Sequence, residues 1–201
     1  LPFAFMTLTA FVKISTVLQI VRGAIGAQNV PSSTVIMAFA GALTILAMAP
    51  LGTRLSDRVA PLLEPSAQTE TAEWLLGVTA AAKEPVVSFL RQNASERERN
   101  RFYEIARAAR PMAERAQVQR DDLTVVVPAF VVSELLAAFA LGFAIYLPFL
   151  VIDLVVANVL LALGMQMLNP TQVSLPFKLL LFVAIDGWGL LAQTLVTGYK
   201  F

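Results

Sequence analysis

The feature that most constrains the fold is a long apolar block, residues 128–198, that contains only four charged side chains. They are Glu134, Asp153, Lys178 and Asp186. A charge at the centre of a lipid bilayer costs at least ~2.5–3.5 kcal/mol, so apolar segments that cross a membrane rarely carry one. These four charges are therefore functional candidates, or they are paired inside an assembly.

The composition excludes an ordinary soluble domain and several kinds of site. Of the 201 residues, 57% are hydrophobic and 14% are charged, whereas a soluble domain has about 25% charged residues. The excess apolar surface needs lipid, detergent or partner subunits to cover it. Because cysteine and histidine are both missing, disulfides, Cys/His zinc sites, cysteine nucleophiles and histidine-based triads are excluded.

Charge and motifs narrow the function classes further. A net charge of +1 gives no electrostatic case for a nucleic-acid partner. The motifs G-x-x-x-x-G-K-[ST], G-x-S-x-G and H-E-x-x-H are all missing. We therefore expect no enzymatic activity, no cofactor and no bound metal. Because the chain opens at Leu1 without a methionine, we also expect residues upstream of it.

The charged residues divide the chain into three parts. Of the 29 charged residues, 22 lie between Arg54 and Asp122, in equal numbers of each sign. This pattern predicts an N-terminal hydrophobic helical hairpin over 1–52, a polar helical insert over 53–124, and a C-terminal hydrophobic helical hairpin over 125–201. The predicted class is an all-α, membrane-associated protein of two long hairpins flanking the insert.

Each hydrophobic part reads as two apolar arms joined by a turn. In the first part, Pro2–Ile25 and Thr34–Pro50 are joined by a Gly/Asn/Pro/Ser-rich turn. In the second part, Val125–Leu163 is longer than the ~20 residues that a span needs. Pro148 and Asp153 interrupt it, which predicts a kinked helix or two helices end to end. With a last helix over Val173–Tyr199, hydropathy predicts four spans.

The polar insert shows helix start and stop signals. Ser95 with Glu98 fits a capping box, in which a hydroxyl and a carboxylate satisfy each other's backbone amides. Charges of alternating sign follow at helical spacing, as in a helix that faces water. Pro111 should break that helix, and a second helix over Gln68–Lys83 should end at Pro85.

The charges in apolar surroundings form a balanced set. Three are basic and three are acidic: Lys13, Arg22, Lys178, Glu134, Asp153 and Asp186. A balanced set favours pairing within the fold or between subunits, because an unpartnered desolvated charge costs ~3–5 kcal/mol. The alternatives are an ion or proton relay through the acids, as in a transporter, and snorkelling or plain solvent exposure of the charges.

The turn Gly164–Pro170 lies between the two arms of the second hydrophobic part. Gly and Asn-Pro form turns, and methionine fills irregular apolar gaps, so a tight turn packed with methionine is one reading. In the other reading, Met165 and Met167 project into a pore or a shared interface as a deformable apolar seal. Spacing alone does not decide between these readings.

A run of motifs across both hydrophobic parts resembles a known family. In the second part the motifs are Ser133-Glu134-Leu135, Gly142-Phe143, Pro148–Val155, Gly164–Met167, Ser174–Val183 and Asp186-Gly187-Trp188. In the first part they are Leu1-Pro2-Phe3, Lys13-Ile14, Arg22–Gly26 and Gln28. In this order they resemble the FliP/SctR family, the core export-apparatus subunit of flagella and of type III secretion injectisomes.

The resemblance implies a protein-transport role in the bacterial inner membrane, with the insert on the periplasmic side. Family members form homo-oligomers with SctS/FliQ-type and SctT/FliR-type subunits, and the resulting helical, cone-like gate passes unfolded exported proteins. These assemblies are held largely above the bilayer plane. The resemblance also implies that the six charges make assembly contacts, and that the family's methionine-rich loop, here Met165, Gln166 and Met167, seals the centre.

The chain departs from the flagellar pattern at three places. Gln166 replaces a methionine in the loop, Gly23 replaces an asparagine, and Leu135-Leu136 lacks the lysine that follows the Ser-Glu pair in flagellar members. The loop and the missing lysine favour an injectisome subunit. A proton-coupled or solute transporter, with Asp153 and Asp186 as relay acids, and a membrane scaffold without a pore are the alternatives.

Overall fold

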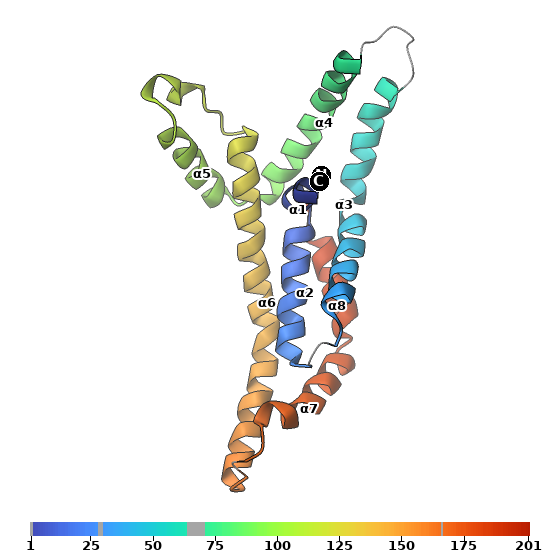
Figure 1. Cartoon of the computed structure of the whole chain (residues 1–201), viewed down its shortest axis with the longest axis vertical. Helices are drawn as coiled ribbons and strands as arrows, with labels where there is room; N and C mark the ends of the chain where they lie inside the picture. The colour runs from blue at the N-terminus through green and yellow to red at the C-terminus, as the bar shows by residue number, and fades with distance from the viewer. Residues whose placement is uncertain (1, 28–29, 64–70, 166) are drawn as a thin grey trace. The chain divides into compact units, whose positions relative to one another are not determined.

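The computed structural model describes residues 2–27, 30–63, 71–165 and 167–201, and every regular element in these ranges is helical (Figure 1). This confirms the all-α class. The elements in chain order are α1 (Pro2–Leu8), α2 (Phe11–Ile25), α3 (Ser33–Leu63), α4 (Thr71–Asn93), α5 (Glu96–Ala108), the 3-10 helix η1 (Met112–Gln117), α6 (Leu123–Ala162), α7 (Pro170–Ala184) and α8 (Gly187–Thr197).

Packing divides the chain into two compact units. Unit 1 contains residues 1–12, 45–134 and 199–201, and unit 2 contains residues 13–44 and 135–198. The long helices α3 and α6 contribute to both units. The division by composition into two hydrophobic hairpins and a polar insert follows different boundaries and stays a prediction.

Two helices are long and apolar enough to cross a membrane. They are α3 over Ser33–Pro61 and α6 over Leu123–Ala162, and a third span results if α7 and α8 are counted as one bent pair. The prediction of four spans is wrong for the part of the chain that the structure describes. The 15-residue α2 is shorter than the ~20 residues that a span needs, and it is separated from α1 at Thr9 and Ala10.

Prolines interrupt the helices less often than the sequence predicts. Helix α6 runs without a break through Pro148, so the prediction of two helices end to end is wrong. Helix α4 does not end at Pro85 but continues to Asn93. An internal proline costs ~3 kcal/mol or more. In α4 the burial of Phe89 and Leu90, directly after Pro85, offsets that cost. The predicted break at Pro111 is confirmed, because α5 ends at Ala108.

The C-terminal arm is bent rather than straight, so the predicted single helix Val173–Tyr199 is wrong. Helices α7 and α8 meet at 57°, and Asp186 adopts the left-handed conformation with φ 50° and ψ 52°. The bend brings backbone close to side chains. A Cβ atom added to Gly187 would lie 2.2 Å from the Phe182 ring, and one added to Gly189 would lie 2.3 Å from the Asp186 carboxylate.

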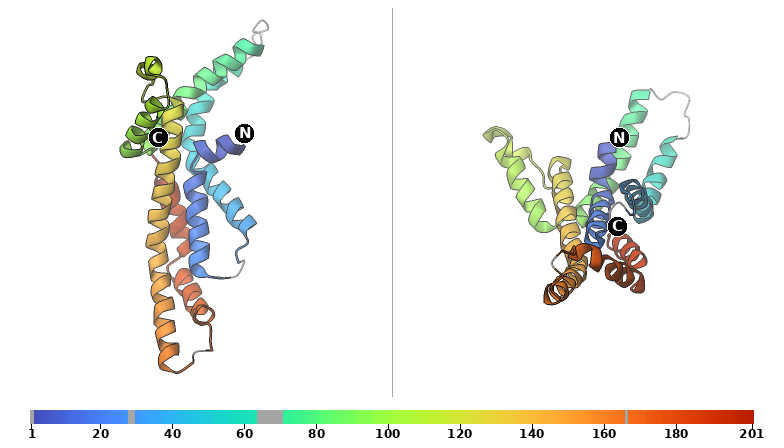
Figure 2. Two further views of the ribbon diagram at one scale, coloured as in Figure 1. Left: turned by 60° about the vertical axis from the view of Figure 1, so that its left-hand side comes forward. Right: turned by 60° about the horizontal axis from the view of Figure 1, so that its bottom comes forward.

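The core of unit 2 is built around one face of α2. Ile14, Val17, Leu18 and Val21 are all fully buried, and their spacing is that of an apolar stripe on a helix. Helix α6 approaches α2 closely, because a Cβ atom on Gly142 would lie 2.6 Å from the Ile20 side chain. Figure 2 shows α6 beside α2 in two further directions. This packing fixes the α6 arm of the C-terminal hairpin.

The polar helix α5 begins with half of the predicted capping box. The Ser95 hydroxyl accepts a hydrogen bond from the Glu98 amide at 3.3 Å. The reciprocal bond is replaced, because the Ser95 amide donates to the Ser133 hydroxyl on α6 at 2.9 Å. The buried Glu98 carboxylate accepts instead from Arg101 at 2.8 Å. The start of α5 is thus tied to α6.

The residues after α8 pack into unit 1. The Asn93 side-chain amide donates to the Lys200 carbonyl at 2.8 Å and accepts from the Lys200 amide at 3.0 Å. The Phe201 ring stacks on Phe89 with 5.4 Å between centroids, and the Tyr199 ring lies 6.1 Å from the same phenylalanine. This segment therefore contributes to the core of unit 1 around α4.

The bend between α7 and α8 makes Gly187 sensitive to substitution. Gly187→Ala puts a methyl group against the Phe182 ring, and overpacking of this kind costs about 1–3 kcal/mol. Gly41→Ala is the matched control, because no atom lies within 4 Å of its added Cβ and alanine favours a helix by about 1 kcal/mol over glycine. Unfolding in detergent, followed by circular dichroism, should show destabilisation of the first variant alone. Equal stability of both variants would contradict the bend as described.

Candidate functional site

The turn between α6 and α7 is fixed by local sequence. Gly164 has a positive φ of 72°, and the Met165 amide donates to the Leu160 carbonyl at 2.9 Å. This arrangement is a glycine-based helix C-cap. On the other side, the Asn169 side chain accepts from the Thr171 amide at 3.0 Å and caps α7. The turn predicted over Gly164–Pro170 is confirmed.

The methionines of the turn project away from the chain. Met167 is 99% exposed and Met165 is 48% exposed, whereas Gln166 lies outside the described residues. The turn forms the tip of the α6–α7 hairpin, at the lower end of the left-hand view of Figure 2. Two unbranched thioethers therefore lie at the tip, one half exposed and one almost fully exposed. Their role as a seal stays a prediction.

A buried polar cluster lies at the base of the same hairpin. The Lys178 ammonium donates to the Asp153 carboxylate at 2.6 Å and to the Ala24 carbonyl at 3.2 Å. The Ser174 hydroxyl donates to the second Asp153 oxygen at 2.5 Å. Lys178 is 3% exposed, Ser174 is fully buried and Asp153 is 28% exposed. The cluster joins α2, α6 and α7.

Sequence reasoning missed Ser174 as a member of this cluster. It lies one helical turn before Lys178 and therefore on the same face of α7. A serine four residues before a lysine in an apolar helix could have indicated that the two side chains share a partner. The serine matters because it satisfies the carboxylate oxygen that the lysine leaves open.

Glu134 is buried in unit 1 against the segment after α8. Its carboxylate accepts from the Tyr199 hydroxyl at 2.5 Å, and the same hydroxyl lies 3.3 Å from the Ala10 carbonyl. Burial first, and then the charge and hydrogen bond of Glu134, raise the pKa of Tyr199. The Ser133-Glu134 pair thus holds the start of α5 with its serine and the residues after α8 with its glutamate.

The remaining predicted charges lie at helix ends. Arg22 donates to the Ser33 hydroxyl at 2.7 Å, across the turn between α2 and α3. Lys13 lies near the end of α8, because a Cβ atom on Gly198 would be 3.6 Å from its ammonium. Asp186 lies exposed in the bend before α8. The structure therefore pairs Asp153 with Lys178.

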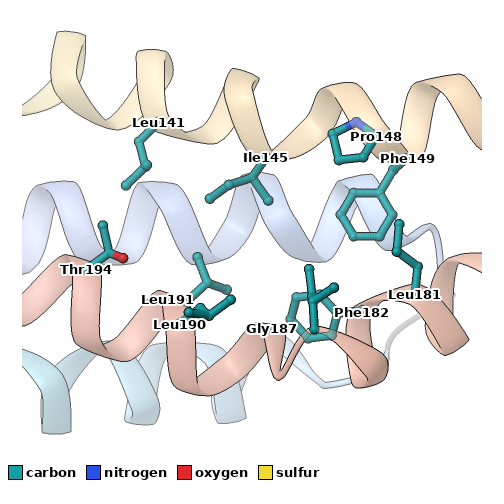
Figure 3. Close-up of a pocket in the computed structure, with 11 residues that line it drawn as sticks. Leu141, Ile145, Pro148, Phe149, Leu181, Phe182, Gly187, Leu190, Leu191 and Thr194 are labelled. Carbon is teal, nitrogen blue, oxygen red and sulfur yellow. The ribbon is translucent and has the colours of Figure 1, made fainter.

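Among the described residues there is no candidate metal centre, and a cavity near the α7–α8 bend is apolar. No three potential metal-ligating side chains cluster in that part of the chain. Between α6 and the α7–α8 bend lies a cavity of about 340 Å³ with an almost wholly apolar lining (Figure 3). Phe149, Phe182 and Leu191 point into it. Its chemistry suits an apolar group and not a polar substrate.

Much of α6 is apolar and uncovered in the single chain. Large side chains that are more than a third exposed recur at helical spacing along it, namely Leu136, Phe139, Phe143, Leu147, Leu150 and Leu154. A continuous exposed apolar face of this kind marks contacts with protein or lipid. Long apolar helices with uncovered faces, carrying a few buried polar pairs, define a helical membrane protein.

Comparison with known proteins places this membrane protein in one family. A model of the FliP family matches residues 1–195. The chain is 40% identical over 200 residues to the hypersensitivity response secretion protein HrcR of Ralstonia nicotianae. The aligned region covers 100% of this chain and 92% of that protein. The chain belongs to the FliP family, as the motifs predicted.

Two further relatives are named for virulence and for translocation. The chain is 37% identical to the virulence protein YscR of Salmonella typhimurium, over 100% of this chain and 91% of that protein. It is 39% identical to the Yop proteins translocation protein R of Yersinia pestis, over 99% of this chain and 90% of that protein. These relatives are injectisome proteins of the SctR type, which confirms the preference for an injectisome over a flagellar subunit.

The ion pair at the base of the hairpin should contribute strongly to stability. Lys178→Ala leaves the Asp153 carboxylate without its charged partner, and we expect the free energy of unfolding to fall by ~3 kcal/mol. This value is at the lower end for a buried pair because Asp153 is 28% exposed. Arg91→Ala is the control, since its pair with Asp121 is exposed on both sides and should cost less than ~1 kcal/mol. Denaturant unfolding in detergent measures both. Similar small losses in the two variants would contradict this ranking.

The buried phenol gives the stability a pH dependence of defined sign. The fold raises the pKa of Tyr199 above the value of about 10 that the residue has in the unfolded chain. The stabilisation by the neutral phenol is therefore fully present below about pH 10. The contribution is lost as the pH rises towards the folded-state pKa. We therefore expect the gap in unfolding free energy between the wild type and Tyr199→Phe to narrow from about pH 9 to pH 11. A gap that stays constant over this range would contradict the assignment.

Proposed function

We propose that this chain is a core subunit of a type III secretion export apparatus and helps to form the gate through which unfolded proteins leave the cell. The observation that carries the proposal is the α6–α7 hairpin, with two exposed methionines at its tip and a buried ion pair at its base. Membership of the FliP family and relatives named for secretion and translocation support the coarser role of a secretion-apparatus subunit.

The uncovered face of α6 supports assembly into a larger complex. Its exposed large side chains recur along several helical turns, as at Phe139 and Phe143, which are 58% and 62% exposed. A membrane-embedded or assembled state would cover this face. The proposed partners are further copies of this chain, subunits of the SctS/FliQ and SctT/FliR types, and membrane lipid.

The chemistry of the tip suits a seal and not a reaction. Methionine is unbranched and flexible, so its side chain adapts to surfaces of different shape. Met165 and Met167, together with Gln166, would close the centre of the assembly around a passing chain and close again behind it. Such a role needs neither catalysis nor a cofactor, and the proposal includes neither.

The proposed location is the bacterial inner membrane, with the polar insert on the periplasmic side. The insert carries ion pairs that face solvent, such as Arg58 with Glu84 and Arg91 with Asp121. The Arg58 guanidinium lowers the pKa of the Glu84 carboxyl, so that pair stays charged in water. A water-facing insert between apolar helices agrees with this location.

The transporter alternative has less support from the geometry. A relay acid must exchange its proton with neighbours, whereas both carboxylate oxygens of Asp153 accept hydrogen bonds from Lys178 and Ser174. The second acid of that alternative, Asp186, lies in the bend and forms no ion pair among the described residues. A fixed structural contact explains Asp153 better than a relay does.

Removing the thioethers should open the gate. In the assembled apparatus, the double variant Met165→Ala, Met167→Ala should increase leakage of ions and small solutes across the membrane, because the short methyl groups cannot fill the centre. Leakage is measured in cells that contain equal amounts of assembled complex. Met112→Ala is the matched control, since Met112 is also exposed, at 85%, but belongs to η1 in unit 1 and not to the turn.

Each possible outcome separates the alternatives. Increased leakage in the double variant alone supports the seal. Unchanged leakage together with normal secretion would remove the seal and favour a scaffold without a pore. A proton-dependent flux that is lost on neutralising Asp186, while oligomers stay intact, would favour the transporter.

A further inference from the structure

The polar cluster at the base of the hairpin connects three helices, and we call it the hairpin clamp. It consists of Asp153 on α6, Ser174 and Lys178 on α7, and the carbonyl of Ala24 on α2. The Ser174 hydroxyl and the Lys178 ammonium approach the two oxygens of the carboxylate at 2.5 Å and 2.6 Å. Hydrogen bonds to a charged group are short and about twice as strong as neutral ones. The clamp therefore holds α7 to α6 at one defined register.

The third connection runs to the end of α2. Lys178 donates to the Ala24 carbonyl at 3.2 Å, in the last turn of that helix. Carbonyls there carry the negative end of the helix dipole and attract a cation. The chain then turns at Gly26, whose φ is 77°, and a Cβ atom added there would lie 3.8 Å from the Lys178 ammonium and 3.7 Å from Thr171. The start of α7 is thus held from two sides.

The clamp lies at a position from which it controls the tip. Nine residues of continuous helix lead from Asp153 to the end of α6, a rise of about 14 Å. On the return arm, Ser174 lies in the second turn of α7. The turn between the arms has its own helix caps at Gly164 and Asn169. Because each arm is one helix and both helix ends at the turn are capped, the angle between α6 and α7 determines where the tip lies.

We propose that the hairpin clamp positions Met165 and Met167, and that Ser174 is a positioning residue of the export gate. The inference rests on the proposed function, because it assigns the clamp a task in sealing. It differs from a role in assembly, in which the charges hold subunits together. Ser174 is the most informative member, because its hydroxyl can be removed without leaving an unpaired charge.

The variants separate positioning from general stability. Ser174→Ala removes one bond to the carboxylate, and Asp153→Asn keeps the shape of the side chain but removes the charge. Thr44→Val is the matched control, because Thr44 is also fully buried and its hydroxyl donates only to the Ala40 carbonyl in its own helix, at 2.7 Å. All variants are compared in the assembled apparatus, at equal amounts of complex.

Two readouts are measured on each variant. The first is leakage of ions and small solutes across the membrane. The second is the rate at which a thiol reagent labels Met167→Cys, which is unique in this chain because the sequence contains no cysteine. A lost hydrogen bond to a charged group shifts the balance between held and released hairpins by on the order of tenfold. We expect a labelling change of this order in Ser174→Ala and Asp153→Asn.

The labelling and leakage results together decide whether the clamp positions the tip. Changed labelling and increased leakage in both clamp variants, with Thr44→Val unchanged, support the inference. Unchanged labelling, or loss of the assembled complex in Ser174→Ala, overturns it, because the cluster then serves assembly or stability alone. If Met165→Ala, Met167→Ala does not leak, the proposed gate fails, and the labelling rates still decide whether the clamp positions the tip.

Discussion

The buried contact between Asp153 and Lys178 is the interaction on which the C-terminal hairpin depends. Both side chains sit in largely apolar helices, and Lys178 is only 3% exposed, so its charge needs partners from the protein. Ser174 and the Ala24 carbonyl complete the set, and three helices become fixed to one another through a single lysine. Glu134 follows the same rule in unit 1, where the Tyr199 hydroxyl satisfies its carboxylate. In both units, a charge in an apolar helix is held by side chains of the same chain.

The sequence predicted elements well where the signal was local. Gly164 and Asn169 set the turn before α7, Ser95 caps α5, and Pro111 follows its end. Proline misled the prediction at Pro85 and Pro148, because burial of neighbouring apolar residues outweighs one lost hydrogen bond. The opposite error occurred at the α7–α8 bend. No proline marks it, and the bend brings the backbone of two glycines close to Phe182 and Asp186, a contact that hydropathy does not record.

The candidate site divides in the same way. The methionine turn was found because its residues are contiguous, and the family resemblance indicated its role. Ser174 and Tyr199 were missed because their partners are distant in sequence, 21 residues away for Asp153 and 65 for Glu134. The balance of three basic and three acidic residues suggested pairing but not which charges meet. The structure shows that Asp153 pairs with Lys178.

The hairpin separates two physical requirements along its length. Hydrogen bonds to a carboxylate are directional, so the base resists changes in the angle between α6 and α7. Dispersion contacts of a thioether are not directional, so the tip can deform around different surfaces without losing specific bonds. A charge at the tip would bring water or a fixed partner into the centre, and a methionine at the base would leave the register of α7 undefined. Met167 at the exposed tip and Lys178 at the buried base are therefore each suited to their own end of the hairpin.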